Sequence, residues 1–443
     1  MFKYIYIIFV ALIPWGSSFS EKLSLGQVYT LTLAHNPELK LSKEGVQFAE
    51  GEQKKAFSEF LPDVDFSSLI GEQRDRNYST KWLRRQFNGT NITGFNPKVD
   101  KHRKELRAGI EYNIFSGFGH YHDYKSDKAK TDIAKLDYEI AESDTLYEVT
   151  RDYFNILILE KTTDLYKKLV TIYERHKKNA SQRYQLKDIT ELQLLDSENK
   201  YLEALSQHSD ATHELISLKQ VLNQKLGRAL DSPVSLNEMP QDEKLDLKDL
   251  NFYLDQMQAR NLKLQKAKFE TLSSKHLKKA SYAEMLFMPH VKLSAAYAYQ
   301  GPEYTDLEKN WEYGVAVKIP LFDGLENLGS QKKAEAGLQS SLIKEKALSD
   351  QSRIEMQRVH QKLQSFLIKE NLYSKKLRYA ELQLSQTQIA YENKTVIRLK
   401  LLEAEASLTR SKIDFLQNER DMKLARLELQ KMIGEPIWNS KNN

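Results

Sequence analysis

Two segments of the chain alternate apolar and polar positions with a period of two. From Val291 to Tyr299 every second residue is apolar, and the same pattern returns from Trp311 to Leu321. The intervening positions are small, polar or charged. Such alternation over about ten residues is typical of a strand with one apolar face, in an outer-membrane barrel or in a soluble half-buried hairpin. The pattern predicts a β-hairpin at about 289–322.

Long stretches without proline follow the predicted hairpins. No proline occurs between His120 and Leu186, where apolar residues keep coiled-coil spacing. At ~1.5 Å per residue, a helix of this length is roughly 100 Å long. We also expect a return helix from about Ile189 to Leu226, and one further helix from about Leu247 to Ala283.

The second half of the chain repeats the first. Glu105–Phe118 aligns with Glu312–Leu325, and Arg183–Ala204 aligns with Ala390–Ser411, both at an offset of 207 residues. A constant offset over more than a hundred residues indicates a tandem duplication. We therefore expect two structural repeats, each with a helix, a hairpin, a very long helix and a return helix.

The predicted boundaries follow from these alignments. The first repeat covers 21–235 with its hairpin at about 62–115, and the second covers 236–443. Phe60–Val64 matches Phe287–Val291 at an offset of 227, so the first hairpin contains 20 more residues. We assign them to the polar stretch Arg74–Lys98 and expect an enlarged loop, because loops tolerate insertions.

A glycine follows each hairpin immediately before the long helix. Ser116-Gly117 and Asp323-Gly324 occupy equivalent positions. Glycine supplies unusual backbone angles, and Ser or Asp can cap a helix start. We interpret Gly117, Asp323 and Gly324 as the bends where a strand passes into a helix.

The first twenty residues have the composition of a cleavable secretory signal peptide. They combine one lysine, an apolar run from Tyr4 to Ile13 and the small-residue ending Ser18-Phe19-Ser20. We expect the mature chain to begin near Glu21, with an uncleaved anchor as the alternative. The chain has no cysteine, which excludes disulfides, thiolate metal sites and a lipidated N-terminal cysteine.

Catalytic and nucleic-acid-binding patterns are missing from the sequence. The net charge of +5 is spread along the chain without a basic tract. His213-Glu214 lacks the second histidine of a zinc-protease helix. His120, His122 and Asp123 offer too few ligands for a metal, so we interpret them as interfacial polar residues. We expect no enzyme activity, no cofactor, no metal and no nucleic-acid partner.

One chain supplies only four predicted strands. A four-stranded sheet cannot close on itself, and an open sheet edge is not tolerated in lipid. If the strands lie in a membrane, the chain must therefore oligomerise. Two copies would give eight strands and three copies twelve, and only the larger ring leaves a plausible pore.

Over nearly its whole mature length, the chain resembles the TolC-type outer-membrane efflux proteins. The resemblance rests on several motifs in order: "LGQVYTLTLAHNPEL" at Leu25–Leu39, "FLPDV" and "MPHV" before the hairpins, "IPLFDG" after the second, the duplicated turn-to-helix segments, and "QKMIGEPIW" near the end. It implies a mainly α fold with a small β part. Three chains would form a transmembrane β-barrel in the outer membrane and a long α-helical barrel in the periplasm.

The resemblance also implies partners. They are two further copies of the chain, outer-membrane lipid, a periplasmic membrane-fusion adaptor, and an inner-membrane pump or ABC transporter. The implied function is a duct that exports substrates, whether drugs, metal ions or proteins. An outer-membrane component of type I protein secretion is an alternative, and a structural coiled-coil envelope protein is a second one.

A periplasmic gate is implied at the turns near Lys187 and Lys394, where the family commonly has glycine. Tyr391 matches a tyrosine of the closing network, and Glu403 matches an inner acidic position. Lys400 stands where another acid is usual, so the polar latch looks incomplete. The alternative for Glu403 is that it only solvates a helix face.

Overall fold

The computed structural model divides into two compact units, which we describe separately. It describes residues 22–72, 102–238, 246–283, 288–303 and 306–436. The helical unit comprises Met1–Lys43, Tyr138–Lys263 and Ser349–Asn443, and the sheet unit comprises Glu44–Asp137 and Leu264–Leu348. Each unit thus takes residues from both sequence repeats. The expected signal peptide (1–20) and enlarged loop (Arg74–Lys98) lie outside the described residues.

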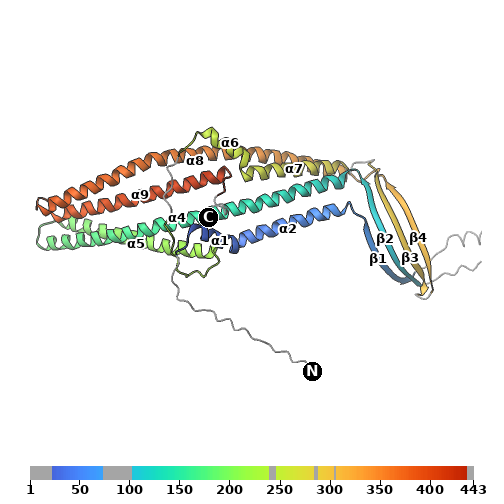
Figure 1. The fold of residues 1–443 in the computed structure, drawn as a ribbon, viewed down its shortest axis with the longest axis horizontal. Helices are drawn as coiled ribbons and strands as arrows, with labels where there is room; N and C mark the ends of the chain where they lie inside the picture. Colours follow the sequence, from blue (N-terminus) through green and yellow to red (C-terminus); the bar gives the residue numbers. More distant parts are fainter. Residues whose placement is uncertain (1–21, 73–101, 239–245, 284–287, 304–305, 437–443) are drawn as a thin grey trace, which may run out of the picture. The chain divides into compact units, whose positions relative to one another are not determined.

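The sheet unit contains a four-stranded antiparallel sheet (Figure 1). Its strands β1 and β2 form the first hairpin, and β3 and β4 form the second. Pairing of β2 with β3 joins the two repeats, so β1 and β4 are the edges. The bounds are β1 (Asp63–Glu72), β2 (His102–Ser116), β3 (His290–Glu303) and β4 (Asp306–Lys318).

Strand β4 is shorter than predicted. It ends at Lys318, whereas the sequence pattern extended the hairpin to about residue 322. Pro320 lacks an N–H group and cannot donate to a strand ladder, so the apolar alternation outlasts the strand. The apolar period alone was therefore a wrong guide to this boundary.

The register places apolar residues of all four strands on one face of the sheet. Phe66 on β1 pairs with Ala108, which pairs with Tyr297 on β3, which pairs with Trp311 on β4. Neighbouring residues point to the opposite face, because side chains alternate along a strand. That opposite face carries two cross-strand ion pairs, Arg107–Glu312 and Lys292–Glu111.

Helices of the sheet unit contact one another through aromatic packing and side-chain hydrogen bonds. They are most of α2 (Pro37–Ser58), most of α7 (Leu262–Ala283) and the first parts of α4 (Gly119–Gln185) and α8 (Glu326–Glu392). Tyr124 on α4 packs against Phe57 of α2, with ring centroids 5.9 Å apart. Thr271 on α7 donates a hydrogen bond to Glu345 on α8 at 2.6 Å.

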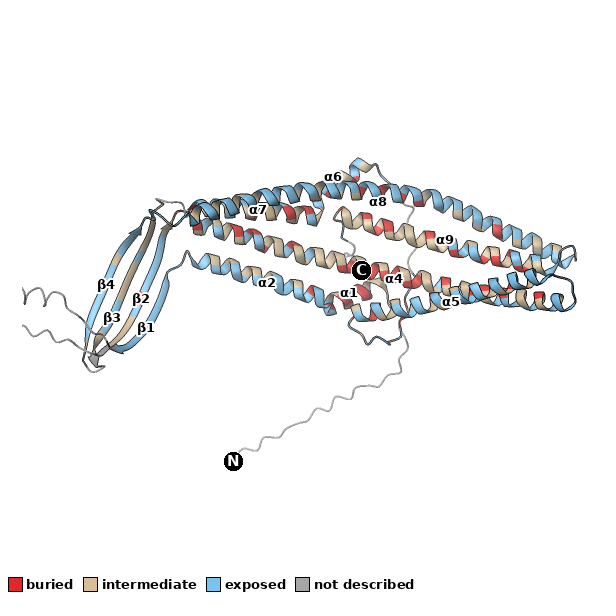
Figure 2. Ribbon diagram, turned by 180° about the vertical axis from the view of Figure 1, so that it is seen from behind, coloured by how far each residue is buried: buried red, intermediate tan, exposed pale blue. Residues whose placement is uncertain are grey.

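The helical unit has its core around the middle of α4. Val149, Tyr153 and Ile156 are almost completely buried there. They pack against Val28 and Leu222, which belong to α1 and α5. Figure 2 marks such buried residues in red along α1 and α4. The unit's other helices are α1 (Leu25–His35), α5 (Glu191–Lys225), α6 (Leu250–Arg260) and α9 (Arg398–Met432).

Corresponding helices of the two repeats have equal lengths. Helices α4 and α8 each have 67 residues, and α5 and α9 each have 35. Helices α1 and α6 have 11 residues each, and α2 and α7 have 22 each. These matched lengths confirm the internal tandem repeat. No helix in the described part of the chain has an apolar stretch long enough to cross a membrane.

The opening helix of each repeat is broken at an asparagine. The sequence predicted one continuous helix at about Leu247–Ala283, but Asn261 adopts an extended backbone and separates α6 from α7. Its side-chain amide donates to the carbonyl oxygen of Met432 at 2.8 Å. Asn36 separates α1 from α2 in the same way, since Pro37 disfavours a helical conformation before it.

Candidate functional site

Both bends between strand and helix use two consecutive residues in the left-handed region. Gly117 has φ +63° and Phe118 has φ +66°, while Gly324 has φ +70° and Leu325 has φ +75°. The sequence identified the two glycines but not the bulky residues after them. Left-handed backbone angles destabilise an L-residue by about 1–2 kcal/mol, so Phe118 and Leu325 are strained.

The surroundings of the two bend glycines differ. A Cβ atom at Gly117 would lie 2.6 Å from the carbonyl oxygen of Ala283 and 2.6 Å from Cγ of Met288. No atom lies within 4 Å of the same position at Gly324. The first bend is therefore closely packed, whereas the second is open.

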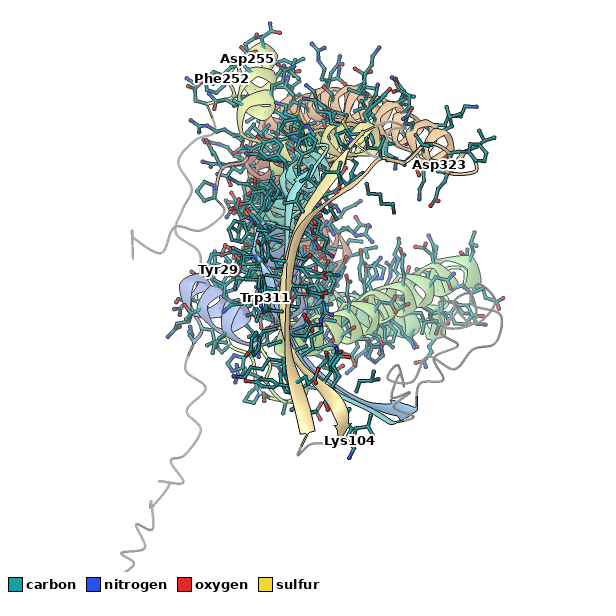
Figure 3. The ribbon with its side chains drawn as sticks, turned by 90° about the vertical axis from the view of Figure 1, so that its right-hand side faces the viewer. Tyr29, Lys104, Phe252, Asp255, Trp311 and Asp323 are labelled. Carbon is teal, nitrogen blue, oxygen red and sulfur yellow. The ribbon has the colours of Figure 1, made fainter. Side chains whose placement is uncertain are left out.

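The carboxylate of Asp323 orders the second bend. It accepts hydrogen bonds from the backbone N–H groups of Leu325 and Asn327, both at 3.0 Å. Leu325 directly precedes α8 and Asn327 lies in its first turn, where backbone N–H groups lack partners within the helix. Figure 3 shows Asp323 and Lys104 at opposite ends of the sheet, so the bend lies at the end of the strands near the helices.

The turns between long and return helices belong to the helical unit, and both use a lysine with left-handed angles. Lys187 has φ +58° and Lys394 has φ +57°. Each lysine N–H donates to the carbonyl oxygen three residues earlier, on Tyr184 and Tyr391 respectively, at 2.9 Å. Lysine thus adopts the conformation for which glycine is usual, and the two turns keep the same backbone geometry.

The first turn is better stabilised by side chains than the second. Thr190 forms a capping box with Gln193 at the start of α5, and Arg183 pairs with Asp188 at 2.7 Å. At the start of α9 the N-cap residue is Ile397, whose side chain gives no cap hydrogen bond. Loss of such a cap costs about 1 kcal/mol, so the α8–α9 turn is the weaker one.

The predicted gate residues lie on and just after this second turn. Lys400 in the first turn of α9 and Glu403 in the next turn form an exposed ion pair at 3.0 Å. The phenol of Tyr391 is partly exposed and has no hydrogen-bond partner within the described residues. Tyr391 therefore lies near the acidic and basic pair in sequence but is not joined to it here.

A histidine near Glu403 was not predicted from the sequence. His176 on α4 has a buried Nδ1 atom without a hydrogen-bond partner in the described chain. Burial lowers the pKa of His176 and Lys200 acts in the same direction, while Glu403 and Asp196 oppose the shift. In sequence, His176 is one polar residue within a long heptad pattern.

The structure places the two histidines weighed as metal ligands against different partners. His120 points towards Glu59, with 3.8 Å between Nδ1 and Oε2. His122 instead meets His276 of α7, with 3.2 Å between their Nδ1 atoms. No group of three or more His, Cys, Asp or Glu side chains suited to a metal occurs in the described part of the chain.

Comparison with known families identifies the chain. The model of the outer membrane efflux protein family matches residues 28–228 and 253–435, which together make up most of the sequence. Among curated proteins, none matches the chain.

Solved structures with the same fold include several outer-membrane proteins. The outer membrane protein VceC of Vibrio cholerae is 16% identical, with a TM-score of 0.77 over 94% of this chain and 97% of VceC. The CmeC outer membrane channel of Campylobacter jejuni is 14% identical, with a TM-score of 0.78 over 97% of this chain and 93% of CmeC. The MtrE outer membrane channel of Neisseria gonorrhoeae, solved in its open state, is 14% identical, with a TM-score of 0.75 over 95% of this chain and 91% of MtrE. At these identities the likeness shows the fold, and the family match gives the relationship. The chain belongs to the outer membrane efflux protein family, which confirms the resemblance found in its sequence motifs.

Proposed function

We propose that three copies of this chain form one export duct, in which their sheets close into a single twelve-stranded barrel. Family membership already assigns the chain to the outer membrane and to efflux. The main observation that supports a trimer is the four-stranded sheet. It exposes an apolar, aromatic face, and both of its edge strands lack a partner within the described chain.

Edge strands β1 and β4 would pair with the edges of neighbouring copies. Figure 2 colours both mostly as exposed. In lipid every backbone N–H and C=O group must be satisfied within the protein, so these open edges require partner strands. The aromatic residues Trp311, Tyr313, Tyr297 and Tyr299 suit a membrane-facing surface, because such side chains gather at the interfaces of membrane barrels.

We expect the mature chain to fractionate with the outer membrane as a heat-labile oligomer. Membrane separation followed by electrophoresis of heated and unheated samples measures this directly. The unheated sample should migrate as an oligomer and the boiled sample as a single chain. Recovery of a monomer in the soluble periplasmic fraction would contradict the barrel.

The helices are proposed to continue as a tunnel through the periplasm and to dock there with an adaptor. Exposed leucines at the first helix turn support this contact: Leu186 is 80% exposed and Leu192 is 77% exposed. The adaptor would connect the duct to an inner-membrane pump or ABC transporter. That partner would select the cargo, which can be a drug, a metal ion or a protein.

The gate is proposed to close at the second helix turn. Its weak capping lets the start of α9 rearrange at low cost, and Glu403 would place three carboxylates around a narrow entrance. Such a ring attracts cations, while the neighbouring Lys400 offsets part of its field. Tyr391 would join the closing contacts made between copies.

Replacing Glu403 with alanine should lower the cation selectivity and the cation block of the reconstituted channel. The trimer yield should stay unchanged, because an exposed ion pair contributes at most about 1 kcal/mol to stability. Planar-bilayer recordings of ion selectivity measure the effect. Lys400→Ala is the matched control and should raise cation selectivity, since it removes the offsetting charge. Unaltered selectivity in Glu403→Ala would assign Glu403 to the solvated exterior.

A further inference from the structure

Two histidines that lie far apart in sequence face each other inside the sheet unit. His122 comes from the first turns of α4 and His276 comes from α7. Their Nδ1 atoms are 3.2 Å apart and their ring centroids are 5.5 Å apart. Without a metal, one Nδ1–H must donate to the lone pair of the other Nδ1. Each ring therefore presents a ligand atom to the same small volume.

The helices that carry this pair are held at a fixed separation. About one helical turn away, the buried hydroxyls of Ser126 on α4 and Ser273 on α7 are hydrogen-bonded at 2.9 Å. On the other side of the pair, a Cβ atom at Gly119 would lie 3.3 Å from Cβ of Ala283. Small side chains thus let the helices approach closely on both sides. The pairing of the two imidazoles is set by this packing.

The spacing of the two nitrogens fits a metal ion. Zinc–nitrogen bonds are ~2.0–2.1 Å long, so nitrogens 3.2 Å apart subtend an angle of about 100° at the metal. This is close to the tetrahedral angle. We propose that His122 and His276 form a two-histidine site for a divalent transition metal of the Zn²⁺, Ni²⁺ and Cu²⁺ class. The metal takes the place of the shared proton, which moves to Nε2 of the same ring, and bridges α4 to α7.

The remaining coordination positions are open to water. His120 is turned towards Glu59, and no third His, Cys, Asp or Glu completes a group in the described residues. Two imidazole ligands give moderate affinity and reversible binding. Imidazole also selects borderline metals and not Mg²⁺ or Ca²⁺, which prefer oxygen ligands.

Burial and nearby lysines favour the neutral form of both imidazoles. Burial is the largest cause that lowers the pKa of each histidine; Lys279 adds to it for both, and Lys125 and Lys275 act on His276. Neutral imidazole is the form that binds metal. The ammonium of Lys125 lies over the ring of Tyr121, 5.5 Å from its centroid. The same positive charges repel every divalent cation, so only a metal that bonds strongly to imidazole nitrogen is retained.

The pair occurs once in the duplicated architecture. At the offsets of the tandem repeat, the position equivalent to His122 is Gly329 and the position equivalent to His276 is Gly51. Both are glycines with no atom within 4 Å of an added Cβ. The repeat-related helix faces therefore carry no ligand at either position. Both histidines are therefore present at one of the two repeat-related sites, and both are replaced by glycine at the other.

Metal binding can be tested on the full-length protein purified in detergent without a histidine tag and stripped with EDTA. Addition of Zn²⁺ or Ni²⁺ should raise the Tm by several degrees, because a ligand that binds the folded state stabilises it. Mg²⁺ should leave the Tm unchanged. Equilibrium dialysis should give one zinc per chain. His122→Gln and His276→Gln should each lose the Tm shift and weaken zinc binding at least tenfold.

His120→Gln is the matched control, since it removes a histidine from the same helical turn without touching the pair. It should keep both the Tm shift and the bound zinc. Electron paramagnetic resonance of the Cu²⁺ form adds a readout that does not depend on stability, and it should show coupling to two imidazole nitrogens. The proposal is overturned if the wild type binds no metal. It is also overturned if His122→Gln and His276→Gln bind zinc as tightly as His120→Gln.

Discussion

Replacing Gly117 with alanine is expected to destabilise the protein by about 2–5 kcal/mol, enough to prevent most assembly into the membrane. Two costs add at this position. Alanine at a φ of +63° is destabilised by the left-handed backbone angles. Its Cβ would also lie only 2.6 Å from the carbonyl oxygen of Ala283 at the end of α7, so the backbone of one of these two segments would have to shift.

Gly324→Ala is the matched variant at the repeat-related bend. Alanine there also adopts strained left-handed angles, at a φ of +70°, but its Cβ would have no atom within 4 Å. We therefore expect the free energy of unfolding to fall by only about 1 kcal/mol. Urea unfolding of the purified variants and their yield in the outer membrane compare the two. A Gly117→Ala variant as stable as Gly324→Ala would show that the first bend is not closely packed.

Replacing Lys225 with methionine is expected to cost about 3–5 kcal/mol, because it leaves a buried carboxylate without its partner. The ammonium lies 2.8 Å from Oδ2 of Asp152 and 2.9 Å from Oε2 of Glu148. The side chain of Asp152 is only 4% exposed. Arg151 lies 3.5 Å from the other oxygen of Asp152 and still partly compensates its charge in the variant. We therefore expect a loss of stability near the lower end of the ~3–5 kcal/mol range.

The same ion network predicts a pH dependence. The hydrogen bond from Lys225 is the largest cause that lowers the pKa of Glu148 in the folded chain. Between the lowered pKa and the ordinary carboxyl pKa the unfolded chain binds more protons. The stabilisation is therefore complete above the ordinary pKa and is lost as the pH falls through the folded value.

Urea unfolding of wild type and Lys225→Met at pH 7 and at pH 4 tests both expectations. The difference between the two proteins should be large at pH 7 and smaller at pH 4. Lys200→Met is the control, because Lys200 pairs with Asp196 at 2.7 Å in an exposed position and should cost less than about 1 kcal/mol. Equal losses for Lys225→Met and Lys200→Met would contradict a buried charge at Asp152.

Sequence periodicity predicted most of the fold because its elements are long and regular. The absence of proline from His120 to Leu186 is matched by α4, Gly119–Gln185. The alternation from Val291 to Tyr299 is matched by β3. Because the two halves repeat at a fixed offset, each helix and strand could also be predicted from two separate stretches of sequence.

What the sequence did not predict depends on contacts between distant segments. Asn261 breaks a helix without a proline after it, and its side chain is held by Met432, 171 residues away. His276 lies 154 residues from His122, so no local pattern could pair them. Phe118 and Leu325 have left-handed angles that their residue types disfavour, and tertiary structure must impose them. The gate assignments of Tyr391, Lys400 and Glu403 stay predictions.

Disulfide crosslinking between edge strands tests the trimeric barrel most directly. The chain has no cysteine, so Phe66→Cys on β1 can be combined with a single cysteine at Tyr313, Val315 or Val317 on the same face of β4. If three sheets close into one barrel, oxidised outer membranes should contain covalent dimers and trimers for at least one pair, with no larger species. A series that ends at dimers, or no inter-chain disulfide for any pair, would contradict a barrel built from three copies.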